Sequence, residues 1–436
     1  MLRQPLLKSL FQLIIFSLPL MIGQLAQMLI GVGDMVVAAW HSTEALAAIG
    51  LALAVIHPLF IGAIGFLAAL SPVLANIRGE GENPKRYAFG SFVYGLVLSL
   101  PFSVLIYFSA LFVDFFNYDA VLSEHIKSYI RISAFSISGA MIFLALKEYL
   151  QSYERVLFAN ILSVACVFLN IALNHSLVFG SIYTPALGID GLAWASVCVR
   201  WFMGLAMIAY VLKDLLCGFN LRFDFMQRVS KLGLPLAITF FFEVLAFSCL
   251  TLLVGHFGQV QAAASSLVLN LASTSFMIPL ALSGAMAVKI GHAYGGRDYR
   301  ALFLHAKAGL MAIFLYVVFT TTVFLFFPQY LLRLYSPEAE VMEIGLRMIF
   351  WVALFQIFDC SQIALGGILR GIAISKVIAI VTFFAYWVIG VPLGYYLAYY
   401  HGYEGEGYWM GMVVALAFVA LSLSCYTYRK FQLLSH

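Results

Sequence analysis

Charged side chains are scarce in this sequence. Lys, Arg, Asp and Glu make up 10% of its 436 residues, whereas soluble domains carry about 25%. Hydrophobic residues make up 63% of the chain, and the 24 basic and 20 acidic side chains are too few to keep so large a folded surface in water. This composition excludes a soluble enzyme, a disordered chain and a nucleic-acid-binding protein, and it predicts a membrane protein.

Paired cysteines and a cleavable leader are also lacking. The six cysteines are scattered singly, mostly within apolar runs, with no CxxC or Cys/His spacing. This pattern indicates buried apolar side chains rather than a disulfide framework or a zinc site. The basic N-terminus leads into an apolar run from Leu10 that is longer than the core of a signal peptide. We therefore expect an uncleaved first membrane span.

Long apolar runs fill the rest of the chain. A transmembrane helix needs about 20 mostly apolar residues, and twelve stretches meet this requirement. They cover residues 11–38, 45–76, 88–112, 124–146, 156–180, 189–212, 231–255, 261–291, 302–327, 340–368, 374–400 and 406–428. Only short polar segments separate them, so we expect no folded domain outside the membrane. The sequence predicts an all-α polytopic membrane protein with twelve transmembrane helices.

The basic residues alternate between the two sides of the membrane. Lys and Arg occur at both ends of the chain and in every second loop, and the loops 40–44, 113–121, 181–188, 256–260 and 401–405 contain none. Because loops rich in Lys and Arg stay in the cytoplasm, this asymmetry predicts cytoplasmic termini and an even number of spans.

An internal repeat divides the chain into halves. The sequence Leu-Pro-Leu around Pro19 recurs around Pro235, an offset of 216, and pairs of alanines and glycines match at the same offset. A six-span repeat enters the membrane twice from the same side, so the two lobes should be related by a pseudo-two-fold axis along the membrane normal. We expect lobes at 1–215 and 231–436, joined by a cytoplasmic linker at 216–230.

Three acidic residues lie within predicted spans. Asp34, Glu243 and Asp359 each stand among apolar residues, where a charge costs roughly 2.5–3.5 kcal/mol. Burial disfavours the charged form of a carboxyl group, so such a group holds a proton or binds a cation. The alternatives are interfacial water for Asp34 and pairing for packing at the other two. We expect Glu243 and Asp359 to bind the coupling cation.

A second polar set lies in the first half of the chain. Asn170 and Asn174 are four residues apart, so they share one face of their helix, and Ser196 follows in the next span. With Asp34 they form a candidate substrate site or second coupling site; interhelical hydrogen bonding is the alternative. Arg200 and Lys307 are expected toward the cytoplasmic half of their spans.

Prolines and aromatic residues complete the candidates. Pro19 and Pro235 interrupt apolar runs, and proline kinks a helix by removing a hydrogen bond. Phe276 and Phe355 lie near the acids in the sequence and could line a cavity, where ring faces attract flat organic cations. A lipid-facing or core position is the alternative for these rings.

At these residues the sequence resembles the multidrug and toxic compound extrusion (MATE) transporters, most closely their NorM branch. The resemblance covers essentially the whole chain. It rests on Pro19 with Asp34 downstream, Glu243, Phe276-Met277-Ile278-Pro279, Asp359 followed by Gly366-Gly367-Ile368-Leu369-Arg370-Gly371, and Val391-Pro392-Leu393-Gly394.

The resemblance implies two six-helix lobes facing a central cavity. It also implies export of lipophilic organic cations, driven by inward Na⁺ or H⁺, with Glu243 and Asp359 holding the cation, including Na⁺ as a metal ion. The DinF branch has an aspartate in its fifth span where this chain has Asn174, which favours the NorM branch. We expect a monomer in the bacterial inner membrane, with no cofactor beyond the coupling ion.

The implied mechanism is antiport by rocking of the lobes, in which substrate and ion compete for one set of acids. Two alternatives remain at the level of sequence. A lipid- or polysaccharide-precursor flippase would line its cavity with several basic residues for phosphate, and this chain has acids there. A membrane-embedded transferase would need a metal or acid motif near a membrane face, which we do not find, so we expect no enzyme.

Overall fold

The chain folds entirely into helices in the part that the structure describes. A computed structural model describes residues 3–116, 118–181, 185–217, 219, 221–335 and 338–435. Eleven of its helices are long and apolar enough to cross a membrane, and a bent pair adds a twelfth if it forms one span. The all-α polytopic class is therefore confirmed, and the bent pair corresponds to the predicted span 124–146.

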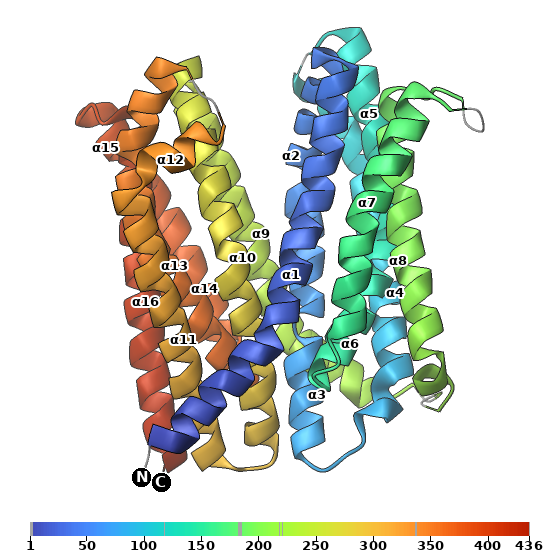
Figure 1. Cartoon of the computed structure of the whole chain (residues 1–436), viewed down its shortest axis with the longest axis vertical. Helices are drawn as coiled ribbons and strands as arrows, with labels where there is room; N and C mark the ends of the chain where they lie inside the picture. Colours follow the sequence, from blue (N-terminus) through green and yellow to red (C-terminus); the bar gives the residue numbers. More distant parts are fainter. Residues whose placement is uncertain are drawn as a thin grey trace. The chain divides into compact units, whose positions relative to one another are not determined.

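The first half of the chain contains eight α-helices and two short helical turns (Figure 1). These are α1 (Arg3–His41), α2 (Thr43–Leu67), α3 (Leu70–Gly79), η1 (Pro84–Tyr87), α4 (Ala88–Ser109), η2 (Ala110–Phe116), α5 (Ala120–Ala134), α6 (Ser136–Ser152), α7 (Leu157–Phe179) and α8 (Ile189–Cys217). The bent pair is α5 and α6, whose axes differ by 41°.

The second half has a similar series. It comprises α9 (Phe223–Gly255), α10 (Gln259–Gly295), α11 (Tyr299–Phe326), α12 (Pro328–Arg333), α13 (Ala339–Gly371), α14 (Lys376–Phe384), η3 (Ala385–Gly390), α15 (Val391–Tyr400) and α16 (Glu404–Ser435). Segment η3 is one turn of π-helix between α14 and α15. Pro392 follows it directly, and proline cannot donate the usual helical hydrogen bond, so a widened turn just before it is physically reasonable.

The ends of several helices follow from local sequence. The side chain of Ser42 accepts a hydrogen bond of 3.0 Å from the backbone N–H of Ala45 and caps α2. Asp298 caps α11 in the same way through Ala301, at 2.9 Å. Such caps satisfy N–H groups that the first helical turn leaves without partners, so these helix starts are encoded locally.

Packing divides the chain into two compact units. One consists of Ile22–Phe241, and the other of Met1–Met21 together with Phe242–His436. This division differs from the predicted boundaries at 216–230, because α1 and α9 each contribute to both units. The changes of unit come shortly after Pro19 and Pro235, the two residues related by the internal repeat.

Specific contacts explain where the first turns of α1 belong. The hydroxyl of Ser9 lies 2.9 Å from Nδ1 of His305 on α11, and Nζ of Lys289 on α10 lies 5.8 Å from the centre of the Phe16 ring. Both partners belong to the second half of the chain. The start of α1 therefore packs as part of the unit that contains α10 and α11.

The first turns of α9 pack within the other unit. The ring of Phe225 lies 4.9 Å from that of Tyr87 in η1 and is almost fully buried. Farther along α9, a Cβ at Gly65 of α2 would lie only 2.5 Å from Cα of Ala237. The two helices therefore touch through their backbones, which a larger residue at position 65 would prevent.

Candidate functional site

Four predicted polar residues meet inside the Ile22–Phe241 unit. Oδ1 of Asp34 on α1 accepts hydrogen bonds from Nδ2 of Asn170 at 3.0 Å and from Nδ2 of Asn174 at 2.7 Å, both on α7. The hydroxyl of Ser196 on α8 donates to Oδ2 of Asp34 at 2.9 Å. All four side chains are buried. The structure therefore brings together the residues that the sequence analysis grouped as a first-half site; their role is still a prediction.

The local sequence explains how α1 comes so close to α7. A Cβ at Gly33 would lie 3.0 Å from Oδ1 of Asn170, so the missing side chain leaves room for the amide. Asn174 also donates to Oδ1 of Asn170 at 3.1 Å, as the four-residue spacing on one helix face allows. Asp34 thus receives three neutral donors, an arrangement that stabilises an ionised carboxylate.

One acceptor in this cluster is left open. Oδ1 of Asn174 is buried and has no hydrogen-bond partner. Buried polar atoms nearly always have one, so this oxygen marks a place where a ligand can add a donor or a cation. Together with the carboxylate of Asp34, it offers oxygen atoms of the kind that hard cations and ammonium groups prefer.

A second acidic site lies in the other unit. Glu243 on α9 and Asp359 on α13 interact electrostatically, and Asp359 is 5% exposed. Oε1 of Glu243 accepts hydrogen bonds from the hydroxyl of Tyr386 at 3.1 Å and from Nε2 of Gln362 at 3.3 Å. Among the residues that the structure describes, we find no hydrogen bond or ion pair to Asp359. Two like charges near each other in a membrane favour a bound cation or proton.

The sequence analysis missed Gln362 as a partner in this site. It lies three residues after Asp359 and hence on the same face of α13, a signal that could have identified it. Its Oε1 is buried without a hydrogen-bond partner. The carboxylates of Glu243 and Asp359 and this amide oxygen fit a hard cation such as Na⁺. Among the described residues no group of three or more His, Cys, Asp or Glu could hold a metal ion, so amide or hydroxyl oxygens would have to complete such a site.

Segment η3 places aromatic side chains around Glu243. The hydroxyl of Tyr386 reaches its carboxylate, and Nε1 of the next residue, Trp387, donates to the backbone oxygen of Phe242 at 3.2 Å. Tyr386 is fully buried. The π-helical turn therefore directs two consecutive side chains toward the same stretch of α9, which a regular helix, with about 100° between neighbours, would do less easily.

The two predicted cavity aromatics differ in position. Phe355 is 3% exposed and packs edge-on against Phe247 and Trp409, with ring centres 5.8 and 5.6 Å apart. It belongs to the packed core of its unit in this conformation, because its neighbours cover it. Phe276 on α10 is only half-buried and is the one of the two that has an open surface.

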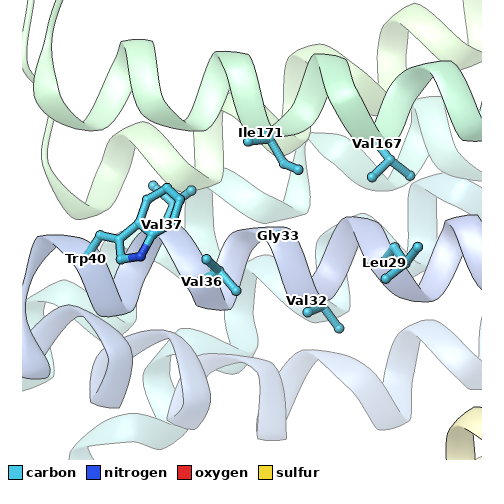
Figure 2. A pocket seen from close by; sticks show the side chains of 8 residues that line it. All are labelled: Leu29, Val32, Gly33, Val36, Val37, Trp40, Val167 and Ile171. Carbon is cyan, nitrogen blue, oxygen red and sulfur yellow. The ribbon is translucent and has the colours of Figure 1, made fainter. Parts of the chain in front are cut away.

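A small apolar pocket adjoins the Asp34 cluster. It has a volume of about 160 Å³ and lies between α1 and α7, lined by Leu29, Val32, Gly33, Val36, Val37, Trp40, Val167 and Ile171 (Figure 2). Gly33 and Ile171 are the sequence neighbours of Asp34 and Asn170. The pocket offers apolar contacts only and no chemistry of its own.

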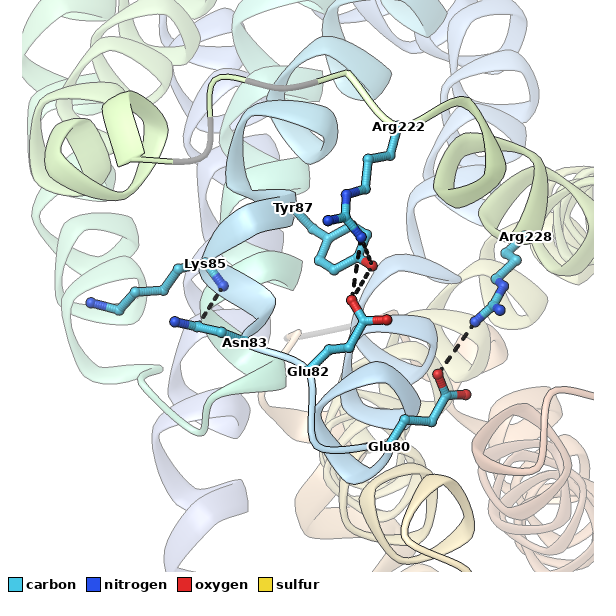
Figure 3. Close-up of polar contacts among 7 residues, drawn as sticks. All are labelled: Glu80, Glu82, Asn83, Lys85, Tyr87, Arg222 and Arg228. Carbon is cyan, nitrogen blue, oxygen red and sulfur yellow. Dashed lines mark hydrogen bonds and ion pairs between the residues drawn. The ribbon is translucent and has the colours of Figure 1, made fainter.

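A charged network lies outside the apolar part of the spans. Arg222, in the segment that leads into α9, pairs with Glu82 at 3.3 Å and donates to the hydroxyl of Tyr87 at 2.9 Å (Figure 3). Arg228 pairs with Glu80 at 3.5 Å. These contacts attach the segment between the halves to the turn that follows α3.

Similarity to known proteins agrees with this arrangement. The MatE family model matches residues 19–175 and again 235–396. The two matches begin at Pro19 and Pro235, so they support the internal repeat at an offset of 216. Proteins named "Multidrug resistance protein NorM" are similar along the whole chain. The one from Photobacterium profundum is 27% identical over 428 residues, with 95% of this chain and 94% of the relative covered. The one from Aliivibrio fischeri is 29% identical over 432 residues, with 96% and 94% covered.

Solved structures share the fold at lower identity. The eukaryotic MATE transporter AtDTX14 has a TM-score of 0.87 at 20% identity, with 97% of this chain and 96% of that one covered. A MOP superfamily transporter from Pyrococcus furiosus has a TM-score of 0.89 at 18% identity, with 99% and 97% covered.

The helices and buried polar sites define a multi-pass membrane transporter, not an enzyme. The chain belongs to the MatE family. The resemblance to MATE transporters and to their NorM branch is thereby confirmed.

Proposed function

We propose that this protein is a secondary active multidrug efflux antiporter that exports lipophilic organic cations in exchange for inward Na⁺ or H⁺. The observation that carries the proposal is the pair of separate, buried carboxylate sites within membrane-spanning helices. Relatives named for multidrug resistance support the substrate class. Buried acids with neutral partners are the groups that recognise cations inside a bilayer.

The first site binds the organic cation. Asp34 provides the charge, and the open oxygen of Asn174 accepts a hydrogen bond from a protonated amine. Ser196 and Asn170 hold the carboxylate in place from two other helices. The neighbouring apolar surfaces accommodate the lipophilic body of the substrate, because multidrug sites are mostly apolar with few polar groups.

The second site binds the coupling ion. Glu243 and Asp359 repel each other when both are charged, and a sodium ion or a proton relieves that repulsion. Ion and substrate each shift the protein toward the conformation that they bind more tightly. Opposite preferences for the inward-open and outward-open states couple their movements in opposite directions.

The setting follows from the charge pattern. The alternation of Lys and Arg between loops supports cytoplasmic termini, and the similarity to bacterial relatives supports the inner membrane. We propose a monomer that takes up its substrates from the cytoplasm or from the bilayer.

The test is ethidium efflux from cells that express the wild type, Glu243→Gln or Glu340→Gln, after separate pulses of sodium and of acid. Glu340 is an exposed acid at the start of α13 and serves as the matched control. We expect efflux evoked by one of the two pulses, lost in Glu243→Gln and kept in Glu340→Gln. If correctly inserted wild-type protein gave no efflux with either pulse, the multidrug function would be excluded and a flippase would become the better hypothesis.

A further inference from the structure

An arginine lies inside the membrane close to the first acidic site. Arg200 stands near the middle of α8 (Ile189–Cys217), four residues after Ser196, whose hydroxyl binds Asp34. Four residues of α-helix rise about 6 Å. Arg200 also interacts electrostatically with Asp34. The structure therefore associates this arginine with the Asp34 site, and the sequence analysis did not include it there.

The contacts of Arg200 leave most of its donors unused. Nη1 donates to the hydroxyl of Ser136 on α6 at 2.9 Å, and Cζ lies 4.8 Å from the centre of the Phe60 ring on α2. A guanidinium group has five N–H donors. Among the residues that the structure describes, we find no carboxylate within ion-pair distance of Arg200. The three side chains that bind Asp34 already occupy its two oxygens.

Backbone packing holds this arginine in place. A Cβ at Gly139 of α6 would lie 2.8 Å from the carbonyl carbon of Arg200 and 2.7 Å from the backbone nitrogen of Trp201. Helices α6 and α8 therefore touch at this level, which brings Ser136 within reach of the guanidinium group. The ring of Phe60 supports the group from a third helix. Such support is typical of a positioned arginine rather than of one that reaches freely to the membrane surface.

A histidine extends the basic surface. His57 lies on α2 three residues before Phe60, hence on a neighbouring part of the same face, and it interacts electrostatically with Arg200. Its side chain is exposed within this unit although it belongs to a membrane-spanning helix. A histidine ring always has at least one N–H to donate. Arg200 and His57 together present donors of the kind that bind carboxylates.

We propose that Arg200 and His57 form a subsite for an anionic group, foremost a carboxylate, on substrates whose cationic end binds Asp34. The inference rests on the proposed function and narrows its substrate class from organic cations to molecules that include zwitterions. A charge buried in a membrane is costly unless it is matched, and a substrate carboxylate supplies the match that the protein lacks. The guanidinium group binds a carboxylate through two parallel hydrogen bonds.

The experiment compares two dyes that differ in one carboxylate. Tetramethylrhodamine is a zwitterion, and its methyl ester carries the same cationic ring system without the negative charge. Binding of each to the purified full-length protein in detergent is measured by fluorescence anisotropy for the wild type, Arg200→Gln and Arg200→Lys. Arg86→Gln is the matched control, because Arg86 is an exposed arginine of the same unit.

We expect Arg200→Gln to weaken binding of the zwitterion by about tenfold or more, the size of one lost charge-assisted interaction. Binding of the ester should stay within about twofold, Arg200→Lys should retain much of the affinity, and Arg86→Gln should change neither dye. An equal loss for both dyes, or no loss for either, overturns the proposal, since Arg200 would then support the fold or the position of Asp34 alone.

Two further measurements keep the outcomes distinct. Benzoate added to wild-type protein should compete with the zwitterion and not with the ester, and an absence of competition also counts against the subsite even if Arg200→Gln does not fold. Asp34→Asn should weaken the ester. If wild-type protein bound neither dye, the proposed function itself would fail, whereas Asp34-dependent ester binding without any effect of Arg200 would refute only the anionic subsite.

Discussion

Asn174 donates a hydrogen bond of 2.7 Å to Asp34 across 140 residues of sequence, and the carbonyl oxygen of the same amide is buried with no partner. The carboxylate thus fixes which way the amide faces. Its NH₂ group points to Asp34 and its oxygen remains available. A site that is held by one contact and open at another is suited to binding a ligand without rearranging its own hydrogen bonds.

Removal of this amide should weaken both the fold and the site. Asn174→Ala deletes the donor to Asp34 and leaves the buried carboxylate with two donors, so we expect a loss of about 1–3 kcal/mol in the free energy of unfolding. Thermal unfolding of purified protein and binding of an organic cation are the measurements. Asn270→Ala is the control, because Asn270 is exposed and bonds only to its own helix. Equal melting temperatures for the two variants would contradict the stabilising role of the Asp34 contact.

Asp359→Asn should separate stability from transport. The substitution removes one of two like charges, so the protein without bound cation should melt at an equal or higher temperature than the wild type, while driven efflux is lost. Sodium or acid should stabilise the wild type, by about 2.7 kcal/mol at 100 times Kd, and should stabilise the variant much less. If the coupling ion stabilised Asp359→Asn as strongly as the wild type, Asp359 would not belong to the ion site.

Two glycines of α2 should respond in opposite ways to alanine. A Cβ at Gly65 would lie 2.5 Å from Cα and 2.7 Å from N of Ala237, which are backbone atoms that cannot move aside. We expect Gly65→Ala to cost about 1–3 kcal/mol through overpacking. Gly50 has nothing within 4 Å of the same position, so Gly50→Ala should be neutral or stabilising by up to about 1 kcal/mol. Chemical denaturation of both variants checks this, and a similar loss in each would contradict the close contact of α2 with α9.

The Glu82–Arg222 pair should contribute little to stability. Its side chains are 44% and 38% exposed, and exposed pairs typically contribute about 0.2–1 kcal/mol. A double-mutant cycle with Glu82→Gln and Arg222→Gln should give a coupling energy in this range that decreases as salt is raised. A coupling well above 1 kcal/mol, unchanged by salt, would show that the network does more than attach one segment to a turn.

Much of this protein could be predicted from the sequence because the membrane imposes local rules. Spans, the orientation of loops and the repeat around Pro19 and Pro235 follow from lengths of apolar runs and from the positions of charges. Asp34, Glu243 and Asp359 stand out for the same reason, since a charge among apolar residues needs an explanation wherever the chain folds. The grouping of Asn170 with Asn174 required only the helical period.

Only the tertiary structure decided which helices supply the partners of those acids. Gln362 and Tyr386 meet Glu243 because α9, α13 and η3 pack together, and no periodicity relates them. Arg200 joins the Asp34 site because the glycine contact between α6 and α8 sets its direction. These contacts depend on how closely and at what rotation helices approach each other, which is determined by the shapes of surfaces far apart in the sequence.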